Sequence, residues 1–284
     1  MTLTHARGTL ELDRCLVMGI VNRTPDSFFD GGRMDLGASV SYAQQLVDEG
    51  ADILDIGAVK AGPGEDVSTD DEAERLLPLV TALGDTGVPL SIETSRPAIA
   101  QQALDAGAAI INDVGGLADP GLAEVCAGQG AGLILMHNGG QIRGRPRAPI
   151  YDDIVRVVID EWHRLASIAN DHGVPNERIV VDAGLDFGKN TFHSLELVRR
   201  LDEQVAEPWP VLVAPSRKDV VGETLGLPLE ERLEGSLALV TLAVTGGAAI
   251  VRVHDVKSAV RTVRMVEAVM GTRNPTAPVR GLWD

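Results

Sequence analysis

The sequence predicts an α/β fold, a (β/α)₈ TIM barrel in a single domain. Short apolar runs alternate with Ala-rich or amphipathic stretches eight times along 284 residues, as such a barrel requires. Aromatic residues make up only 3% of the chain, so Val, Leu, Ile and Ala build the core, as parallel sheets covered by helices favour. A doubly wound nucleotide-binding sheet is disfavoured, because no Gly-x-Gly-x-x-Gly turn follows the first apolar run.

The predicted elements follow one another in a regular order. The strands are Leu16–Val21, Asp52–Ile56, Pro89–Ile92, Ala109–Ile111, Gly132–Met136, Arg178–Val181, Val211–Val213 and Ala249–Val253. The helices are Ala38–Glu49, Asp71–Leu83, Pro97–Ala106, Pro120–Gly128, Asp153–His172, His193–Leu201, Leu229–Thr245 and Val256–Met270. Gly50, Gly107 and Gly247 each separate a helix from a strand, where a left-handed cap favours glycine. We assign residues 1–271 to the barrel and residues 272–284, rich in Pro and Arg, to a C-terminal surface extension.

Composition restricts the class of partner and the compartment. The net charge of -16 disfavours nucleic acid and anionic membranes as partners. The first 13 residues are too polar for a signal peptide, and no apolar run reaches the roughly 20 residues of a membrane span, so we expect a cytoplasmic protein. Cys15 and Cys126 are too few for a disulfide framework and are expected to be buried thiols.

Chemistry-bearing residues stand at the carboxyl ends of the predicted strands, where TIM barrels hold their active sites. In chain order they are Asn22, the Gly57–Gly64 loop, Glu93, Asn112, Asp113, Met136, His137, Asp182, Ser216, Arg217, Lys218, Arg252 and His254. Taken singly, several have ordinary explanations. Asn22 and Asp182 are suited to cap turns, and His137 and His193 are more often packed or solvated than catalytic. The combination favours a binding site, because independent turn caps would not all fall at strand ends.

The residue types suggest two halves of one ligand. A cyclic amidine, such as the 2-amino-4-oxo face of a pterin, needs a carboxylate opposite its N–H donors, which Asp182 supplies beside Asn112 and Glu93. Lys218 is suited to a ring carbonyl or ring nitrogen. Arg252 and His254 lie two apart on one strand and therefore on one face, where they suit an anionic leaving group such as diphosphate. Mg²⁺ is the expected cofactor, with Asn22 as an oxygen ligand.

The first of these loops resembles a known signature. Asn22-Arg23-Thr24-Pro25-Asp26-Ser27-Phe28, with Asp30-Gly31-Gly32, is similar to the first motif of the dihydropteroate synthase family. The resemblance extends over nearly the whole chain. It continues in Glu93-Thr94-Ser95, Ile111-Asn112-Asp113, Leu135-Met136-His137, Asp182-Ala183-Gly184, Phe187-Gly188-Lys189-Asn190, Ser216-Arg217-Lys218 and Arg252-Val253-His254-Asp255.

The resemblance implies a reaction and a role for each matching residue. In that family a pterin-methyl diphosphate loses diphosphate, and the amine of p-aminobenzoate captures the pterin methylene. It implies a pterin pocket formed by Glu93, Asn112, Met136, Asp182 and Lys218. Asn22, Arg252 and His254 would hold the diphosphate, with Mg²⁺ on Asn22, and Lys218, Arg252, His254 and Asn22 would be the catalytic residues. It also implies a homodimer and no covalent enzyme nucleophile. Lys189 and Asn190 are expected to be structural.

The acceptor side departs from the family pattern. The second loop, usually Gly-Gly-Glu-Ser-Thr-Arg-Pro-Gly, here reads Gly57-Ala58-Val59-Lys60-Ala61-Gly62-Pro63-Gly64, so its arginine is replaced by glycine. Arg23 and Lys60 are the candidates to supply the lost charge. The family's aspartate after the third strand is Glu93 here. Asp219 follows Ser216-Arg217-Lys218 where the family often has a serine that holds the p-aminobenzoate carboxylate.

The carboxylate of Asp219 and the carboxylate of a bound p-aminobenzoate would repel each other. The residues assigned to the acceptor and its loops are Arg23, Thr24, Pro25, Phe28, Lys60, Arg217 and Asp219. We interpret the chain as a dihydropteroate synthase-like transferase that joins the pterin diphosphate to p-aminobenzoate and releases diphosphate. Three alternatives remain open: a divergent paralogue that uses another amine or catalyses little, a pterin-binding methyltransferase module, and a scaffold without catalysis. The methyltransferase module has no need of Arg252, His254 and a metal-binding amide.

Overall fold

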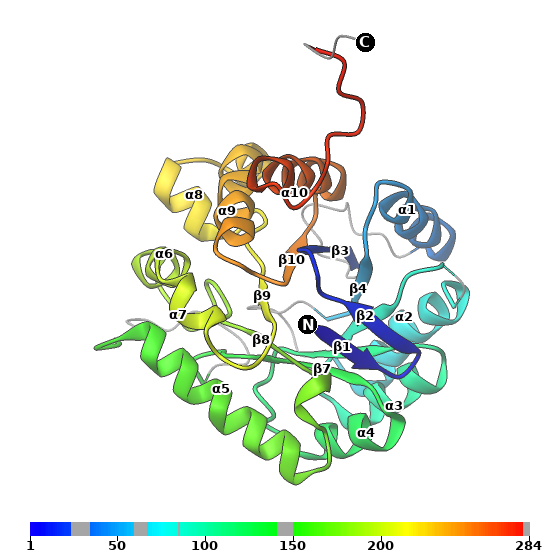
Figure 1. The fold of residues 1–284 in the computed structure, drawn as a ribbon. Coiled ribbons are helices and arrows are strands. Elements are labelled where there is room, and N and C mark those ends of the chain that lie inside the picture. The colour runs from blue at the N-terminus through cyan, green and yellow to red at the C-terminus, as the bar shows by residue number, and fades with distance from the viewer. Residues whose placement is uncertain (24–34, 60–66, 85, 141–149, 281–284) are drawn as a thin grey trace.

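Eight parallel strands close into a barrel, which confirms the predicted TIM-barrel fold (Figure 1). The structure is a computed structural model, and it describes residues 1–23, 35–59, 67–84, 86–140 and 150–280. The strand order around the barrel is β10-β3-β4-β5-β6-β7-β8-β9. The strands are β3 (Leu16–Asn22), β4 (Ile53–Gly57), β5 (Leu90–Glu93), β6 (Ile110–Asp113), β7 (Gly132–Met136), β8 (Ile179–Asp182), β9 (Val211–Val213) and β10 (Ile250–Val253).

Helices surround the barrel and bury their apolar faces against its outer wall (Figure 1). They are α1 (Leu36–Asp48), α2 (Thr69–Ala82), α3 (Pro97–Asp105), α4 (Gly121–Gln129), α5 (Ile154–Asp171), α6 (Thr191–Arg199), α7 (Leu201–Val205), α8 (Asp219–Leu225), α9 (Leu233–Thr245) and α10 (Val256–Met270). The expected helix 193–201 is interrupted at Arg200, whose backbone leaves the helical region at φ −107° and ψ 38°. The expected helix 229–245 begins with a separate 3₁₀ turn, Leu229–Glu231, and the short α8 was not predicted.

An antiparallel hairpin closes the amino-terminal end of the barrel. It consists of β1 (Thr2–His5) and β2 (Gly8–Glu11), paired with His5 opposite Gly8. Leu3, with Leu12 just after the hairpin, packs inside the barrel against Met18 and other apolar side chains of the strands. The hairpin therefore excludes water from this end of the interior, a role that the strand–helix alternation did not reveal.

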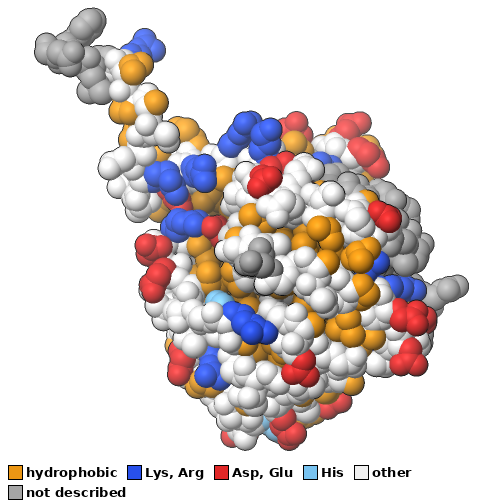
Figure 2. All heavy atoms as spheres, turned by 90° about the vertical axis from the view of Figure 1, so that its right-hand side faces the viewer, with side chains coloured by type: hydrophobic (Ala, Val, Ile, Leu, Met, Phe, Trp, Pro, Cys, Tyr) orange, Lys and Arg blue, Asp and Glu red, His pale blue; other side chains and the backbone are white. Residues whose placement is uncertain are grey.

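Glycines end several helices as expected. Gly50, Gly107 and Gly247 have φ angles of 102°, 120° and 90°, in the region that favours glycine. Both cysteines are buried free thiols, also as expected. Within the described residues, no helix is long and apolar enough to cross a membrane. Figure 2 shows acidic and basic side chains dispersed over one face, and the chain after α10 projects away from the body.

Candidate functional site at the carboxyl end of the barrel

A row of residues in register forms the rim of the barrel. Asn22 pairs with Gly57, Gly57 with Glu93, and Glu93 with Asn112, so four neighbouring strands end side by side. Gly57 contributes no side chain, and a Cβ atom there would lie 3.7 Å from both Asn22 Oδ1 and Glu93 Cβ. The backbone thus places the Asn22 amide and the Glu93 carboxylate on adjoining parts of one surface, as the sequence predicted.

Asp55, which was not predicted from the sequence, organises the polar interior. Its carboxylate is fully buried in the middle of β4. Asp55 Oδ1 accepts from Ser91 Oγ at 2.5 Å, and Oδ2 accepts from Asn112 Nδ2 at 3.1 Å and from Arg252 Nε at 2.6 Å. A signal was present in the sequence, because an aspartate inside the apolar run Ile53–Ile56 must be paired once it is buried.

Arg252 joins two carboxylates across the barrel. Its Nη2 donates to Glu93 Oε2 at 2.5 Å, while its Nε donates to Asp55. Burial opposes ionisation of Arg252, but the charges of Asp55 and Glu93 raise its pKa. Burial raises the pKa of Glu93 to about 7, and the nearby Asp55 acts in the same direction. Arg252, expected to bind a leaving group, therefore also balances the charge of the barrel interior.

Asp182 and Lys218 form the opposite side of the site. Asp182 Oδ1 accepts from the Gly184 amide at 2.7 Å, as expected for a turn cap. Burial raises the pKa of Asp182 and lowers that of Lys218, while the charge of each favours ionisation of the other. Lys218 Nζ donates to Leu185 O at 2.7 Å and lies 5.0 Å from the ring centroid of Phe187.

Gly184 is required for this arrangement. Its φ angle is 65°, and a Cβ atom there would lie 2.3 Å from the carbonyl oxygen of His137 and 3.0 Å from Cγ of Met136. The loop after β8 therefore passes directly over the end of β7. Met136 is buried at that strand end, beside the strand that carries Asp182, as the sequence predicted.

His254 has the chemistry of a neutral imidazole. Its backbone amide donates to Ser216 Oγ at 3.1 Å, and its Nδ1 lies 3.1 Å from the same oxygen. Burial, and next the charge of Arg252, lowers the pKa of His254 to about 3. At neutral pH the ring is therefore a hydrogen-bonding group and not a resident cation.

Lys189 and Asn190 have the structural roles expected of them. Lys189 Nζ is buried and contacts His137 Nδ1 at 2.7 Å and three backbone carbonyls at 2.8 to 3.1 Å. Asn190 caps α6 by accepting from the His193 amide at 2.9 Å, and the His193 ring accepts from the Asn190 amide in return. These contacts connect the loop after β8 to the loop after β7. They also give His137 and His193 structural roles, so neither histidine needs a catalytic role to explain its position.

Two carboxylates lie near the start of α8, the region that the sequence assigned to the acceptor. Asp219 is the first residue of α8, and its Oδ1 accepts from Arg232 Nη1 at 3.0 Å. Asp186 Oδ2 accepts from the amide of Val220 at 3.1 Å, so a side chain already occupies that amide. Asp186 has a φ angle of 69°, which is rare outside glycine. Asp219 was predicted from the sequence, whereas Asp186 and Arg232 were not.

The two expected loop arginines contact protein groups. Arg217 forms a two-point ion pair with Asp255, at 2.8 and 2.9 Å, and its Nη1 donates to the carbonyls of Leu229 and Glu230. Arg23 is buried and donates from Nη1 to the carbonyl of Arg75 on α2. The other assigned residues of the acceptor loops, Thr24, Pro25, Phe28 and Lys60, lie outside the described residues.

Comparisons with known proteins agree with this geometry. The family model described as pterin binding enzyme matches residues 18–254. The chain is 47% identical to a Mycobacterium leprae protein named inactive dihydropteroate synthase 2, over 95% of this chain and 96% of that protein. It is 39% identical to the dihydropteroate synthase of Bacillus subtilis, over 91% of this chain and 90% of that one.

A solved structure shares the fold in detail. The Yersinia pestis dihydropteroate synthase, described in complex with a sulfonamide drug, superposes with a TM-score of 0.91 at 38% identity, covering 96% of this chain and all of that one. The match spans the barrel and the strand ends described above. The chain therefore belongs to the pterin-binding enzyme family, and within that family it is similar to the dihydropteroate synthases and to proteins named inactive dihydropteroate synthase 2.

Proposed function

We propose that the protein binds a (7,8-dihydropterin-6-yl)methyl diphosphate at the carboxyl end of its barrel, and that p-aminobenzoate is a poor acceptor there. The observation that carries the first part is the buried Asp182 carboxylate, held by the Gly184 amide beside Lys218. A buried carboxylate needs donors to offset its lost hydration, and the N–H groups of a pterin supply them.

The neighbouring groups complement the rest of a pterin ring. Because Asn112 donates its amide N–H to Asp55, its carbonyl oxygen is oriented to accept from a ligand. Lys218 suits a ring carbonyl or nitrogen, and Met136 contributes apolar contact. Glu93, one methylene longer than the usual aspartate, meets Arg252 at 2.5 Å and so takes part in charge balance as well.

Arg252, His254 and Asn22 are the proposed diphosphate site. The synthase reaction breaks the C–O bond to diphosphate, which leaves with the electron pair, and the amine nitrogen forms the new C–N bond and releases a proton. A neutral His254 is suited to donate a hydrogen bond to a phosphate oxygen, and the charge of Arg252 stabilises the departing anion.

A magnesium ion fits this donor set only together with the substrate. Within the described residues there is no group of three or more His, Cys, Asp and Glu that would hold a metal ion. Mg²⁺ commonly uses one or two protein oxygens and completes its shell with phosphate and water. Asn22 would be the protein ligand, and the ion would neutralise charge on the diphosphate when bound.

The acceptor half supports a divergent paralogue. Asp186 accepts from an amide in the first turn of α8, and Asp219 is the first residue of that helix, where the family places the p-aminobenzoate carboxylate. Arg232 offsets Asp219, but the Val220 amide is already taken by Asp186. The similarity to proteins named inactive dihydropteroate synthase 2 supports the same conclusion.

The test is diphosphate release from the pterin diphosphate, with and without p-aminobenzoate, alongside calorimetric binding of the pterin diphosphate. We expect tight binding with little release in the presence of p-aminobenzoate. Asp182→Ala should remove most of the binding affinity, whereas Asp171→Ala, a change at an exposed position on α5, should leave it unchanged. Rapid dihydropteroate formation would contradict the proposed acceptor defect, and unchanged binding in Asp182→Ala would contradict the pterin pocket.

We also expect a homodimer in the cytoplasm. Leu242 on α9 and Met265 and Val269 on α10 are large apolar side chains exposed on the last two helices. Such side chains are suited to an interface between two copies. Sedimentation of the wild type against Val269→Glu tests this, and a monomeric wild type would contradict it.

A further inference from the structure

The loop after β9 holds His254 at two atoms. His254 directly follows β10, and Ser216 lies in the loop that leads from β9 to α8. Ser216 Oγ accepts a hydrogen bond from the His254 backbone amide at 3.1 Å, and the same oxygen lies 3.1 Å from His254 Nδ1. One hydroxyl group therefore contacts both the backbone and the ring of this histidine.

The hydroxyl proton of Ser216 decides which ring nitrogen carries a proton. Ser216 is buried, and among the described residues His254 Nδ1 is the one acceptor within hydrogen-bond distance of its hydroxyl. If Nδ1 carried the proton, Ser216 Oγ would accept from two N–H groups and its own proton would be buried without an acceptor, which is costly. Both groups are satisfied when Ser216 donates to Nδ1 and the proton of the ring is on Nε2.

The residues next to this contact fix its geometry. Arg217, which follows Ser216, forms a two-point ion pair with Asp255, which follows His254, at 2.8 and 2.9 Å. The backbone amide of Arg217 also donates to Ser236 Oγ on α9 at 2.8 Å. The loop after β9 is thus joined to the end of β10 at neighbouring positions, which holds the hydroxyl against the ring.

The surrounding charges keep the ring neutral. Burial lowers the pKa of His254 to about 3, and the charge of Arg252 acts in the same direction more strongly than Asp255 opposes it. The charges of Arg217 and Lys218 also lower this pKa. Because a neutral imidazole has a single N–H, the position of its proton decides which nitrogen donates to an anion.

We propose that Ser216 is a positioning residue that keeps the proton of His254 on Nε2, so that the ring donates a hydrogen bond from Nε2 to the departing diphosphate. The identity of the anion rests on the proposed function, whereas the position of the proton does not. Ser216 acts through His254, since its hydroxyl proton is used by the ring.

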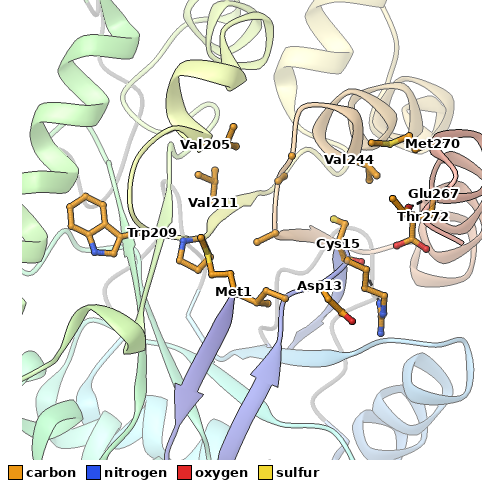
Figure 3. Close-up of a pocket in the computed structure, with 16 residues that line it drawn as sticks. Met1, Asp13, Cys15, Val205, Trp209, Val211, Val244, Glu267, Met270 and Thr272 are labelled. Carbon is orange, nitrogen blue, oxygen red and sulfur yellow. Dashed lines mark hydrogen bonds between the residues drawn. The ribbon is translucent and has the colours of Figure 1, made fainter.

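Nitrogen NMR spectra of the full-length protein test the position of the proton. The wild type should show a protonated Nε2 and an unprotonated Nδ1 on His254. Ser216→Ala should move both signals toward the average of the two tautomers, and Ser216→Thr, which keeps a hydroxyl, should restore the wild-type pattern. The control is Thr272→Val, which removes a hydroxyl beside the cavity at the opposite, amino end of the barrel and should change neither signal (Figure 3).

Calorimetry tests whether Ser216 acts through His254. The pterin diphosphate is compared with the same pterin that carries a hydroxymethyl group in place of the diphosphate ester. Ser216→Ala should weaken the diphosphate ester about three- to tenfold, because only molecules with the proton on Nε2 are competent to bind it, and should leave the hydroxymethyl compound unchanged. His254→Ala should cause at least the same loss, and adding Ser216→Ala to it should cause no further loss.

Three results would overturn the inference: a protonated Nδ1 in the wild type, unchanged spectra in Ser216→Ala, or additive losses in the double variant. Equal weakening of both ligands by Ser216→Ala would show a general structural role and would overturn it as well. Failure of the wild type to bind the pterin diphosphate would instead overturn the proposed function, and the nitrogen spectra would still decide where the proton lies.

Discussion

Replacement of Asp219 by serine should lower the KM for p-aminobenzoate. Two carboxylates about 4 Å apart repel by about 1 kcal/mol in water and about 4 kcal/mol at the lower effective dielectric of a protein surface. Arg232 lies 3.0 Å from Asp219, and the Asp219 side chain is 35% exposed, so the repulsion energy is near the lower of these two values. The change also releases Arg232 to attract the substrate. We expect the relieved repulsion and the released Arg232 together to strengthen binding of p-aminobenzoate by about 1–2 kcal/mol. This corresponds to a KM that is about 5- to 30-fold lower.

The assay measures diphosphate release as the concentration of the acceptor is varied. p-Toluidine, which replaces the carboxylate with a methyl group, is the matched acceptor, and its KM should not change. Asp202→Ser on α7 controls for net charge. An equal improvement for both acceptors, or no change for p-aminobenzoate, would refute the electrostatic reasoning.

A second change should have the opposite effect. A Cβ atom on Gly222 would lie 2.4 Å from the guanidinium of Arg232, so Gly222→Ala displaces that side chain from Asp219. The KM for p-aminobenzoate should rise, and Arg232→Met should reproduce the rise. An unchanged KM in both variants would show that Arg232 does not shield Asp219.

Three further outcomes follow from the buried polar groups. Asp182→Ala should remove most calorimetric affinity for pterin, because ring donors lose their partner. Asp55→Asn should lower the free energy of unfolding by about 1–3 kcal/mol in urea titrations, because it leaves the buried Arg252 with Glu93 as its remaining carboxylate partner. His137 and His254 have pKa values of about 3 in the fold, below the ordinary value of 6.5 for histidine, so each should reduce stability as pH falls below about 6.5. Glu93, whose pKa burial raises to about 7, and Asp182, whose pKa burial also raises, act in the opposite direction as the pH falls. His137→Gln should therefore reduce the stability lost between pH 6.5 and pH 5 in unfolding titrations, and an unchanged loss would contradict the assignment of a neutral, buried imidazole.

The sequence by itself determined the barrel and the position of its site. Strand and helix periods are local properties, and a parallel barrel always brings the carboxyl ends of its strands together. Asn22, Glu93, Asn112 and Asp182 were therefore predictable at the rim without knowledge of any contact. The departures from the family's sequence pattern at Asp219 and in the second loop, Gly57–Gly64, were equally visible, because they depend on residue identity alone.

Only the tertiary structure decided how the charged groups pair. Asp55 and Arg252 are 197 residues apart, and they meet because the last strand closes the barrel beside the first. The pairing of Asp219 with Arg232 and the cap that Asp186 provides to α8 depend on loop conformations that no period encodes. The same holds for the hairpin at the amino end, since packing between distant segments places it.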